Sequence, residues 1–298
     1  MQTDRPIIFG EVLFDTFPDG SEVLGGAPFN VAWHLQGFGL TPLFISRIGD
    51  DERGKQVLQA MERWGLSTEG IQLDCRYPTG VVTIALADGQ PNFNILPDQA
   101  YGFIDINAAR DAFSSTSPSL LYYGSLINRS HQSQTTLKAL LDEGLPSFVD
   151  INLRSPWWNI TLLKELLSSA RWLKLNDAEV EEICQERLGD RGALKKAAKK
   201  LASKYKLDLL IVTMGSEGAF LIHNNHEIES PPAQVNNLVD TVGAGDAFAS
   251  VMLLGLMKDW SLDVALGRAI EFAAAVCEVQ GATIMDKDFY SLHLERWK

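Results

Sequence analysis

Short apolar or β-branched runs alternate along the chain with stretches of helical periodicity. The runs are predicted to be strands, at residues 6–13, 42–49, 120–125, 147–152, 171–176 and 207–215. Helices are predicted in between, for example at 28–39, where apolar residues recur at intervals of three and four, and at 52–65. Strands that alternate with helices indicate βαβ units. We therefore expect an α/β fold with a doubly wound, mostly parallel central sheet and helices on both faces.

Two segments break this alternation. Residues 13–26 contain a Pro-Asp-Gly turn between extended pieces, and residues 80–96 contain an Asp-Gly turn between two alternating runs, which is a hairpin signal. We expect a small antiparallel β-sheet built from segments inserted at about 13–26 and 78–98 into one domain spanning 1–298. A small sheet outside the main layers is a candidate lid over a site, although a hairpin without function carries the same local pattern.

Composition and charge indicate the cellular compartment and limit the classes of binding partner. The 298 residues carry a formal net charge of −12, which disfavours binding to nucleic acid or an anionic membrane. The cysteines, Cys75, Cys184 and Cys277, are far apart, which is typical of a reducing compartment. The chain starts without a signal-peptide pattern, and its apolar runs are too short to cross a bilayer. We expect a cytoplasmic protein.

The candidate chemistry lies in one glycine-rich turn, DTVGAGDAF at 240–248, which is followed by the pattern of a buried helix. Glycines allow backbone N–H groups to converge at a helix N-terminus, where they form an anion hole. Asp246 in this turn is either a helix-capping acid or a functional carboxylate. A carboxylate repels phosphate but can accept the proton of an attacking hydroxyl. Phosphoryl transfer to an alcohol needs both parts.

Other common catalytic motifs are missing from the sequence. There is no Walker-type phosphate loop, no complete dinucleotide-binding G-x-G-x-x-G and no G-x-S-x-G nucleophile elbow. The glycine-rich turn also lacks the lysine that phosphate-binding loops usually carry. Phosphoryl transfer is therefore the chemistry that the sequence favours, with the charge on phosphate neutralised from outside the turn.

Taken together, several motifs resemble those of the ribokinase-like (PfkB) carbohydrate kinases. A second glycine-rich signature, GGAPFNVAWHLQGFG, lies at 25–39. Further matches follow the family's order: GEVLFD at 10–15, RIGDDERG at 47–54, DINLRSPWW at 150–158, LKLNDAEVEE at 173–182 and VTMGSEGAF at 212–220. The GEVLFD and DINLRSPWW runs are similar to the fructokinase branch.

The resemblance implies a ribokinase-like fold and the transfer of the ATP γ-phosphoryl group to a primary hydroxyl, foremost C6 of fructose. Ribose, another ketohexose or a nucleoside are alternative acceptors, and a non-catalytic sugar or nucleotide sensor is the alternative outside the enzyme class. The predicted lid segments contain no cluster of Lys or Arg, so a neutral sugar is favoured over a sugar phosphate. The resemblance also suggests a homodimer formed through the lid sheets.

The resemblance assigns roles to individual residues on the acceptor side. Asp246 is the catalytic base, and Gly243, Ala244 and Gly245 supply the anion hole. Arg154 contacts the phosphates and the substrate, with a structural ion pair as its alternative. The sugar-binding residues are Asp15, Gly25, Gly26, Asn30 and, from the lid, Phe93.

On the nucleotide side, Asn176 and Glu179 would organise Mg²⁺ and its waters, with a helix cap as the alternative. The ATP-binding turn comprises Thr213, Gly215 and Gly218, and a plain strand-to-hairpin turn is its alternative. A monovalent cation, K⁺, would be bound by the Asp240 side chain and by the carbonyls of Val242, Val276, Val279 and Gly281. The family's basic residue before the final Gly-Ala is replaced here by Val279-Gln280.

Overall fold

The computed structural model describes residues 4–87 and 90–298, with the backbone alone for 85–87 and 90–93. In this part of the chain the main sheet has nine strands in the order β13-β12-β11-β10-β9-β8-β1-β4-β5. All neighbouring strands from β11 to β5 pair in parallel, whereas the pairs β11–β12 and β12–β13 are antiparallel. The bounds are β1 (Arg5–Phe9), β4 (Leu43–Gly49), β5 (Ile71–Asp74), β8 (Pro118–Gly124), β9 (Ser147–Asp150), β10 (Trp172–Asn176), β11 (Leu209–Thr213), β12 (Ala219–His223) and β13 (His226–Ser230).

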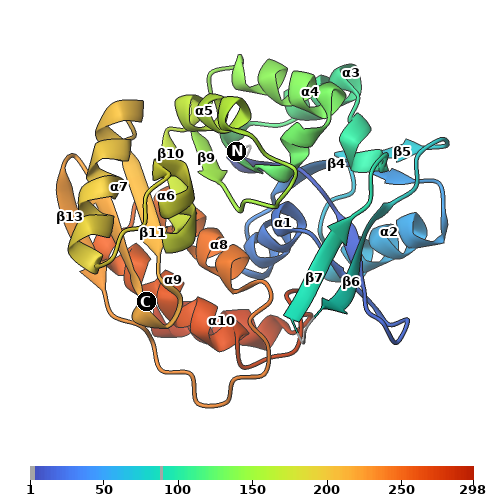
Figure 1. Cartoon of the computed structure of the whole chain (residues 1–298). Helices are drawn as coiled ribbons and strands as arrows, with labels where there is room; N and C mark the ends of the chain where they lie inside the picture. The colour runs from blue at the N-terminus through green and yellow to red at the C-terminus, as the bar shows by residue number, and fades with distance from the viewer. Residues whose placement is uncertain (1–3, 88–89) are drawn as a thin grey trace.

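Helices cover both faces of this sheet, as the sequence pattern predicts (Figure 1). One face packs against α1 (Ala27–Gly37), α2 (Glu52–Trp64), α8 (Ala244–Met257), α9 (Leu262–Val276) and α10 (Lys287–Arg296). The other packs against α3 (Ile106–Ser114), α4 (His131–Leu141), α5 (Ile160–Ser169), α6 (Asp177–Cys184) and α7 (Arg191–Tyr205). Within β1, Ile8 enters one core and Ile7 and Phe9 the other, which explains the continuous apolar run.

The prediction of one strand over 6–13 is wrong. The chain leaves the main sheet after Phe9 and enters a second sheet at β2 (Leu13–Thr16). Crowding accompanies the break: a Cβ at Gly10 would lie 2.4 Å from the Pro28 side chain at the start of α1. The strand switch therefore brings the first turn of α1 against the carboxyl end of β1.

The second sheet has the order β3-β2-β6-β7, with β3 at Glu22–Gly25, β6 at Gly80–Ala87 and β7 at Gln90–Ile95. Each predicted hairpin is antiparallel, but β2 and β6 pair in parallel, so the sheet is mixed and not purely antiparallel. The predicted Asp88-Gly89 turn lies outside the described residues. Figure 1 shows β6 and β7 to one side of the main body, outside the helical layers.

Two connections differ from the predicted alternation. The strand at 207–215 is followed by the antiparallel β12 and not by a helix, because a short 3₁₀ turn, η3 (Gly215–Glu217), reverses the chain. In the sequence, no clear helical pattern directly follows the run at 120–125, yet β8 is followed by a helix, α4, after the 3₁₀ turn η2 (Leu126–Arg129). A further 3₁₀ turn, η1, spans Ala100–Phe103. Across the described residues, none of the helices combines the length and hydropathy needed to cross a lipid bilayer.

Candidate active site

The first turn of α8 brings the glycine-rich motif to the centre of the site. Asp246 is nearly fully buried and accepts a hydrogen bond from the Asn30 side-chain amide at 2.8 Å, across 216 positions of sequence. Gly243 is the N-cap of α8, and no side chain caps this helix. The carboxylate of Asp246 is therefore bonded to α1 and does not cap α8, but Asp246 does lie in the first turn of the helix, where an acid also stabilises the helix dipole.

The predicted anion hole has the geometry that a glycine requires. Gly243 adopts a left-handed conformation with φ of 78°, and a Cβ there would lie 2.3 Å from the Ala282 Cβ. The helix begins at Ala244, and Gly245 beside it is exposed. A helix leaves its first N–H groups without intrahelical partners, and its N-terminus carries partial positive charge. The motif thus presents an anion-binding N-terminus to solvent next to the Asp246 carboxylate.

Three of the predicted sugar-binding residues converge on this point. A Cβ at Gly25 would lie 3.7 Å from Asn30 Oδ1 and 3.9 Å from Asp15 Oδ2, so these residues surround one position. Asp15 lies on β2 of the small sheet, whereas Asn30 lies on α1. Gly26, the fourth residue, is the N-cap of α1. The side chain of Phe93, the fifth, falls outside the described residues.

Arg154 follows β9 and is exposed. Among the described residues its guanidinium takes part in no ion pair, so the alternative role of Arg154 in a structural ion pair is not supported there. Its charge opposes the rise that burial causes in the pKa values of Asp15 and Asp246. This arrangement leaves its N–H donors for an anionic ligand.

Burial dominates the electrostatics of the two aspartates. It raises the pKa of Asp246 to about 7, against the opposing effects of the Asn30 hydrogen bond and of the Lys174 and Arg154 charges. Burial likewise raises the pKa of Asp15 to about 6, with Arg154 opposing the rise. A carboxylate with a pKa near 7 is suited to general base catalysis at neutral pH.

The motif search missed a buried lysine beneath the anion hole. Lys174 on β10 lies opposite Asp150 on β9, and its Nζ is 2.9 and 2.8 Å from the two carboxylate oxygens. The same Nζ is 3.6 Å from the position of a Cβ at Gly245. The one sequence signal is a lysine within the apolar run LKLN. Positive charge is therefore present beside the motif, although the turn itself carries no lysine.

Asn176 and Glu179 form the capping box that their spacing also allows. The Asn176 side chain accepts from the Glu179 N–H, and the Glu179 carboxylate accepts from the N–H groups of Asn176 and Leu153, at 2.8 and 2.7 Å. Each carboxylate oxygen keeps one further acceptor site. These residues therefore fit a magnesium ion that is held through its waters, which suits the preference of Mg²⁺ for few protein ligands.

The predicted ATP-binding turn lies next to this capping box. Thr213 is directly beside Asn176 in the parallel pairing of β10 and β11. Gly215 is exposed and has open space around its Cβ position. At Gly218 a Cβ would lie 2.4 Å from the Ser230 carbonyl oxygen, so this glycine serves the hairpin turn. The hairpin alternative therefore fits Gly218, whereas Thr213 and Gly215 line the edge where the strands end.

The residues predicted to bind a monovalent cation come together only in part. The Asp240 carboxylate accepts from the N–H groups of Val242 at 2.9 Å and Gly281 at 3.2 Å, which joins these three residues. The Val276 carbonyl accepts from the Val279 N–H at 3.1 Å, at the end of α9. The described residues contain no cluster of three or more His, Cys, Asp or Glu side chains suited to a metal.

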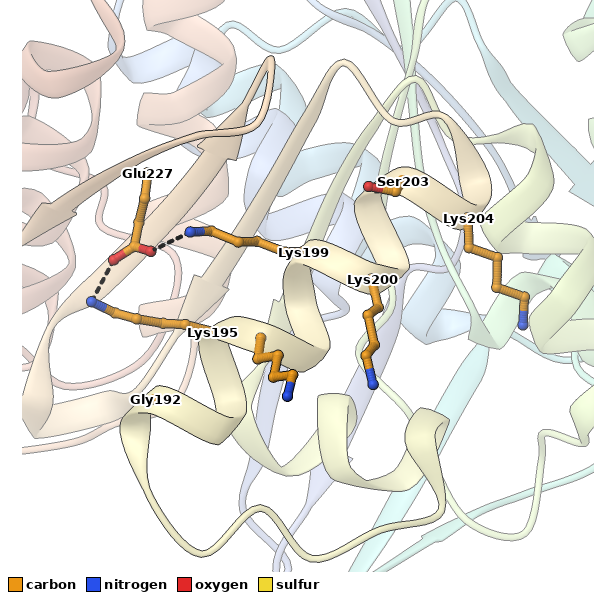
Figure 2. A pocket seen from close by; sticks show the side chains of 8 residues that line it. Gly192, Lys195, Lys199, Lys200, Ser203, Lys204 and Glu227 are labelled. Atoms are coloured by element: carbon orange, nitrogen blue, oxygen red, sulfur yellow. Dashed lines mark ion pairs between the residues drawn. The ribbon is translucent and has the colours of Figure 1, made fainter.

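A separate groove of about 890 Å³ runs along α7 (Figure 2). Its lining residues are Gly192, Lys195, Lys196, Lys199, Lys200, Ser203, Lys204 and Glu227. Lys195 and Lys199 both form ion pairs with Glu227, at 2.5 and 3.1 Å. None of the predicted site residues lines this groove, and its charges are those of a solvated helix face.

Comparison with known proteins identifies the family and the relatives of this chain. Residues 8–288 match the model of the pfkB family carbohydrate kinases. The chain is 30% identical to probable fructokinase-5 of Arabidopsis thaliana, over 94% of each chain. It is similar in structure to an uncharacterized sugar kinase of Pyrococcus horikoshii, with a TM-score of 0.81 and 28% identity over 96% of each chain. A fructokinase of Xylella fastidiosa with bound ATP has a TM-score of 0.84 and 22% identity over 98% of each chain, and so shares the fold.

The doubly wound sheet with its mixed second sheet is the ribokinase-like fold, and the family match over residues 8–288 defines the class as carbohydrate kinase. The chain belongs to the PfkB family of carbohydrate kinases.

Proposed function

We propose that this kinase uses ATP to phosphorylate a primary hydroxyl of a neutral sugar, with fructose and its C6 hydroxyl as the foremost acceptor. The observation that carries the proposal is the buried Asp246 carboxylate, which is bonded to Asn30 and stands at the glycine-rich start of α8. The fructokinase relatives support fructose. The lid segments, without a Lys or Arg, support an acceptor that carries no phosphate.

In the proposed reaction Asp246 accepts the proton of the attacking hydroxyl. A bond forms between the sugar oxygen and the γ-phosphorus of ATP, the bond from that phosphorus to the bridging oxygen breaks, and ADP leaves. The N–H groups at 243–245 stabilise the negative charge of the group in transit, and Arg154 adds positive charge from the open side. Asp15, Gly25, Gly26 and Asn30 orient the acceptor. The small sheet acts as the lid that excludes water.

Metal ions complete the proposed site. Asn176 and Glu179 would hold Mg²⁺ through its waters, and the ion would neutralise charge on the ATP phosphates. Asp240 with the carbonyls of Val242, Val276, Val279 and Gly281 would hold K⁺ beside the anion hole. Thr213 and Gly215 would line the nucleotide.

A panel of acceptors tests this function. The purified protein is incubated with ATP, Mg²⁺, K⁺ and each of fructose, ribose, other ketohexoses and nucleosides, and ADP is measured by a coupled assay. We expect the highest kcat/KM with fructose. A preference for a nucleoside would overturn the fructokinase assignment but not the kinase class. Binding of ligands without turnover of any acceptor would favour the sensor.

The pH dependence of the reaction should report the raised pKa of Asp246. The carboxylate is protonated, and unable to act as a base, below its pKa of about 7. We therefore expect kcat/KM for the acceptor to rise about tenfold per pH unit below that value and to level off above it. Initial rates between pH 5 and pH 9 measure the profile. A flat profile would contradict the assignment of Asp246 as the base.

We also propose a homodimer formed through the small sheets. A sheet edge presents unpaired backbone groups that a second copy can cover. Val23 on the edge strand β3 is an exposed apolar side chain at this surface. Light scattering coupled to size exclusion should give about twice the mass of the chain, and the mass of a single chain would contradict this proposal.

A further inference from the structure

A buried glutamate with no assigned role lies on the acceptor side of the site. Glu11 occupies the short connection between β1 and β2, at the carboxyl end of a central strand, where ligands bind in doubly wound sheets. Its side chain is 4% exposed, and its Oε2 has no hydrogen-bond partner among the described residues. Gly26 packs on its backbone, because a Cβ at Gly26 would lie 2.8 Å from the Glu11 carbonyl oxygen.

Two other buried polar atoms near Glu11 also lack partners within the described ranges. They are the Tyr101 hydroxyl in η1 and Nη1 of Arg129 in η2. The Arg129 guanidinium lies over the rings of Tyr101 and Trp157, 5.5 and 4.6 Å from their centroids. Burial raises the pKa of Tyr101, while the Arg129 charge lowers it and the Glu11 charge raises it. A Cβ at Gly80 would lie 2.5 Å from the Val12 carbonyl oxygen and 3.0 Å from the Tyr101 ring, so Tyr101 lies beside the residue that follows Glu11.

Glu11 is linked to Asp246 through α1, because Gly26, which packs on the Glu11 carbonyl, is the N-cap of this helix, and Asn30 on the same helix bonds to Asp246. Burial raises the pKa of Glu11 to about 7, and the charge of Asp246 adds to the rise, whereas Arg154 and Arg129 oppose it. Tyr101 also lies beneath the lid, since a Cβ at Gly80, the first residue of β6, would be 3.0 Å from its ring. Tyr101, with Arg129 over its ring, therefore lies next to the small sheet.

The three unpaired polar atoms of Glu11, Tyr101 and Arg129 define which ligand groups could bond to them. They offer one acceptor, the Glu11 oxygen, and two donors, the Tyr101 hydroxyl and the Arg129 N–H, which do not bond to one another. A sugar hydroxyl is both a donor and an acceptor, so adjacent hydroxyls can satisfy all three. Buried polar atoms without partners are costly, and folded proteins keep them mainly at functional sites.

We propose that Glu11, Tyr101 and Arg129 bind the hydroxyls of the acceptor that are not phosphorylated. Glu11 accepts a hydrogen bond, and Tyr101 and Arg129 donate. The inference rests on the proposed sugar-kinase function and deepens it, because it specifies a polyhydroxylated acceptor.

Two variants test the inference, Glu11→Met and Tyr101→Phe. Acceptor affinity is measured by calorimetry without nucleotide, and KM by the coupled assay, with the best sugar of the panel. We expect Glu11→Met to weaken sugar binding about tenfold or more, and Tyr101→Phe about fivefold, while the KM for ATP stays within twofold. Glu11→Gln should retain most of the affinity, because its amide oxygen still accepts.

Thermal melting separates this role from a structural one. Both variants remove a buried polar atom that has no partner, so we expect melting temperatures at or above that of the wild type. A structural role predicts lower melting temperatures with unchanged sugar affinity. Glu62→Met, on an exposed position of α2, is the matched control and should change neither quantity.

The possible failures are distinguishable. If the wild type phosphorylates a sugar and both variants bind that sugar as tightly as the wild type does, the inference is overturned and the kinase function stands. If the wild type phosphorylates no acceptor of the panel, the proposed function itself is overturned.

Discussion

Asp246→Asn is expected to lower kcat by about a hundredfold to ten-thousandfold, the range typical of a lost general base. Sugar binding should change little, because the amide oxygen of the substituted side chain can still accept the hydrogen bond that Asn30 donates at 2.8 Å in the wild type. The loss therefore belongs in kcat and not in the dissociation constant of the acceptor. Steady-state kinetics and calorimetry of the acceptor measure the two quantities separately.

A matched control is available on the neighbouring helix. Asp263 also lies in the first turn of a helix, α9, but it is exposed and distant in sequence from the glycine-rich motif. Asp263→Asn should leave kcat within twofold of the wild type. If Asp246→Asn showed a kcat as high as that of this control, Asp246 could not be the base.

Lys174→Met is expected to lower the free energy of unfolding by about 3–5 kcal/mol, because it leaves a buried carboxylate without its partner. In the native protein both oxygens of Asp150 contact Nζ of Lys174, and both side chains are buried. Urea unfolding followed by circular dichroism measures the change. The double variant Lys174→Met/Asp150→Asn should recover much of the loss, since both charges are then absent.

An exposed pair provides the comparison for this prediction. Arg171 contacts Asp208 at 2.6 Å, but both side chains are about half exposed. Arg171→Met should therefore cost no more than about 1 kcal/mol. A similarly small loss for Lys174→Met would show that burial of the pair does not make it structurally important.

Local sequence patterns predict much of this fold because they record which faces are buried. The continuous apolar runs of the parallel strands and the helical periodicity between them predicted β1, β4, β8, β9, β10 and β11 of the central sheet, but not β5, β12 or β13. The break of the strand at Gly10 was not predicted, because Glu11-Val12-Leu13 continues an extended, mainly apolar run. The close approach of Pro28 requires a glycine at position 10, because a Cβ there would clash, and this contact joins elements that are separate in the sequence.

The site shows the same division between local and distant information. The glycine-rich turn at 243–245 could be predicted from the sequence, because the positive φ and the close packing at Gly243 require a glycine. The pairing of Lys174 with Asp150 depends on the register of β9 and β10, and the grouping of Glu11, Tyr101 and Arg129 depends on three connections that meet only in the fold. A single residue that does not belong to a motif does not indicate such contacts in the sequence.

The proposed function is tested most directly by identifying the product of the reaction. The protein is incubated with ATP, Mg²⁺, K⁺ and fructose, and the product is examined by phosphorus and carbon NMR, for the wild type and for Asp246→Asn. We predict fructose 6-phosphate and ADP from the wild type and almost no product from the variant. A phosphate on a different hydroxyl, or equal product from both proteins, would contradict the proposal that Asp246 activates the primary hydroxyl of the sugar.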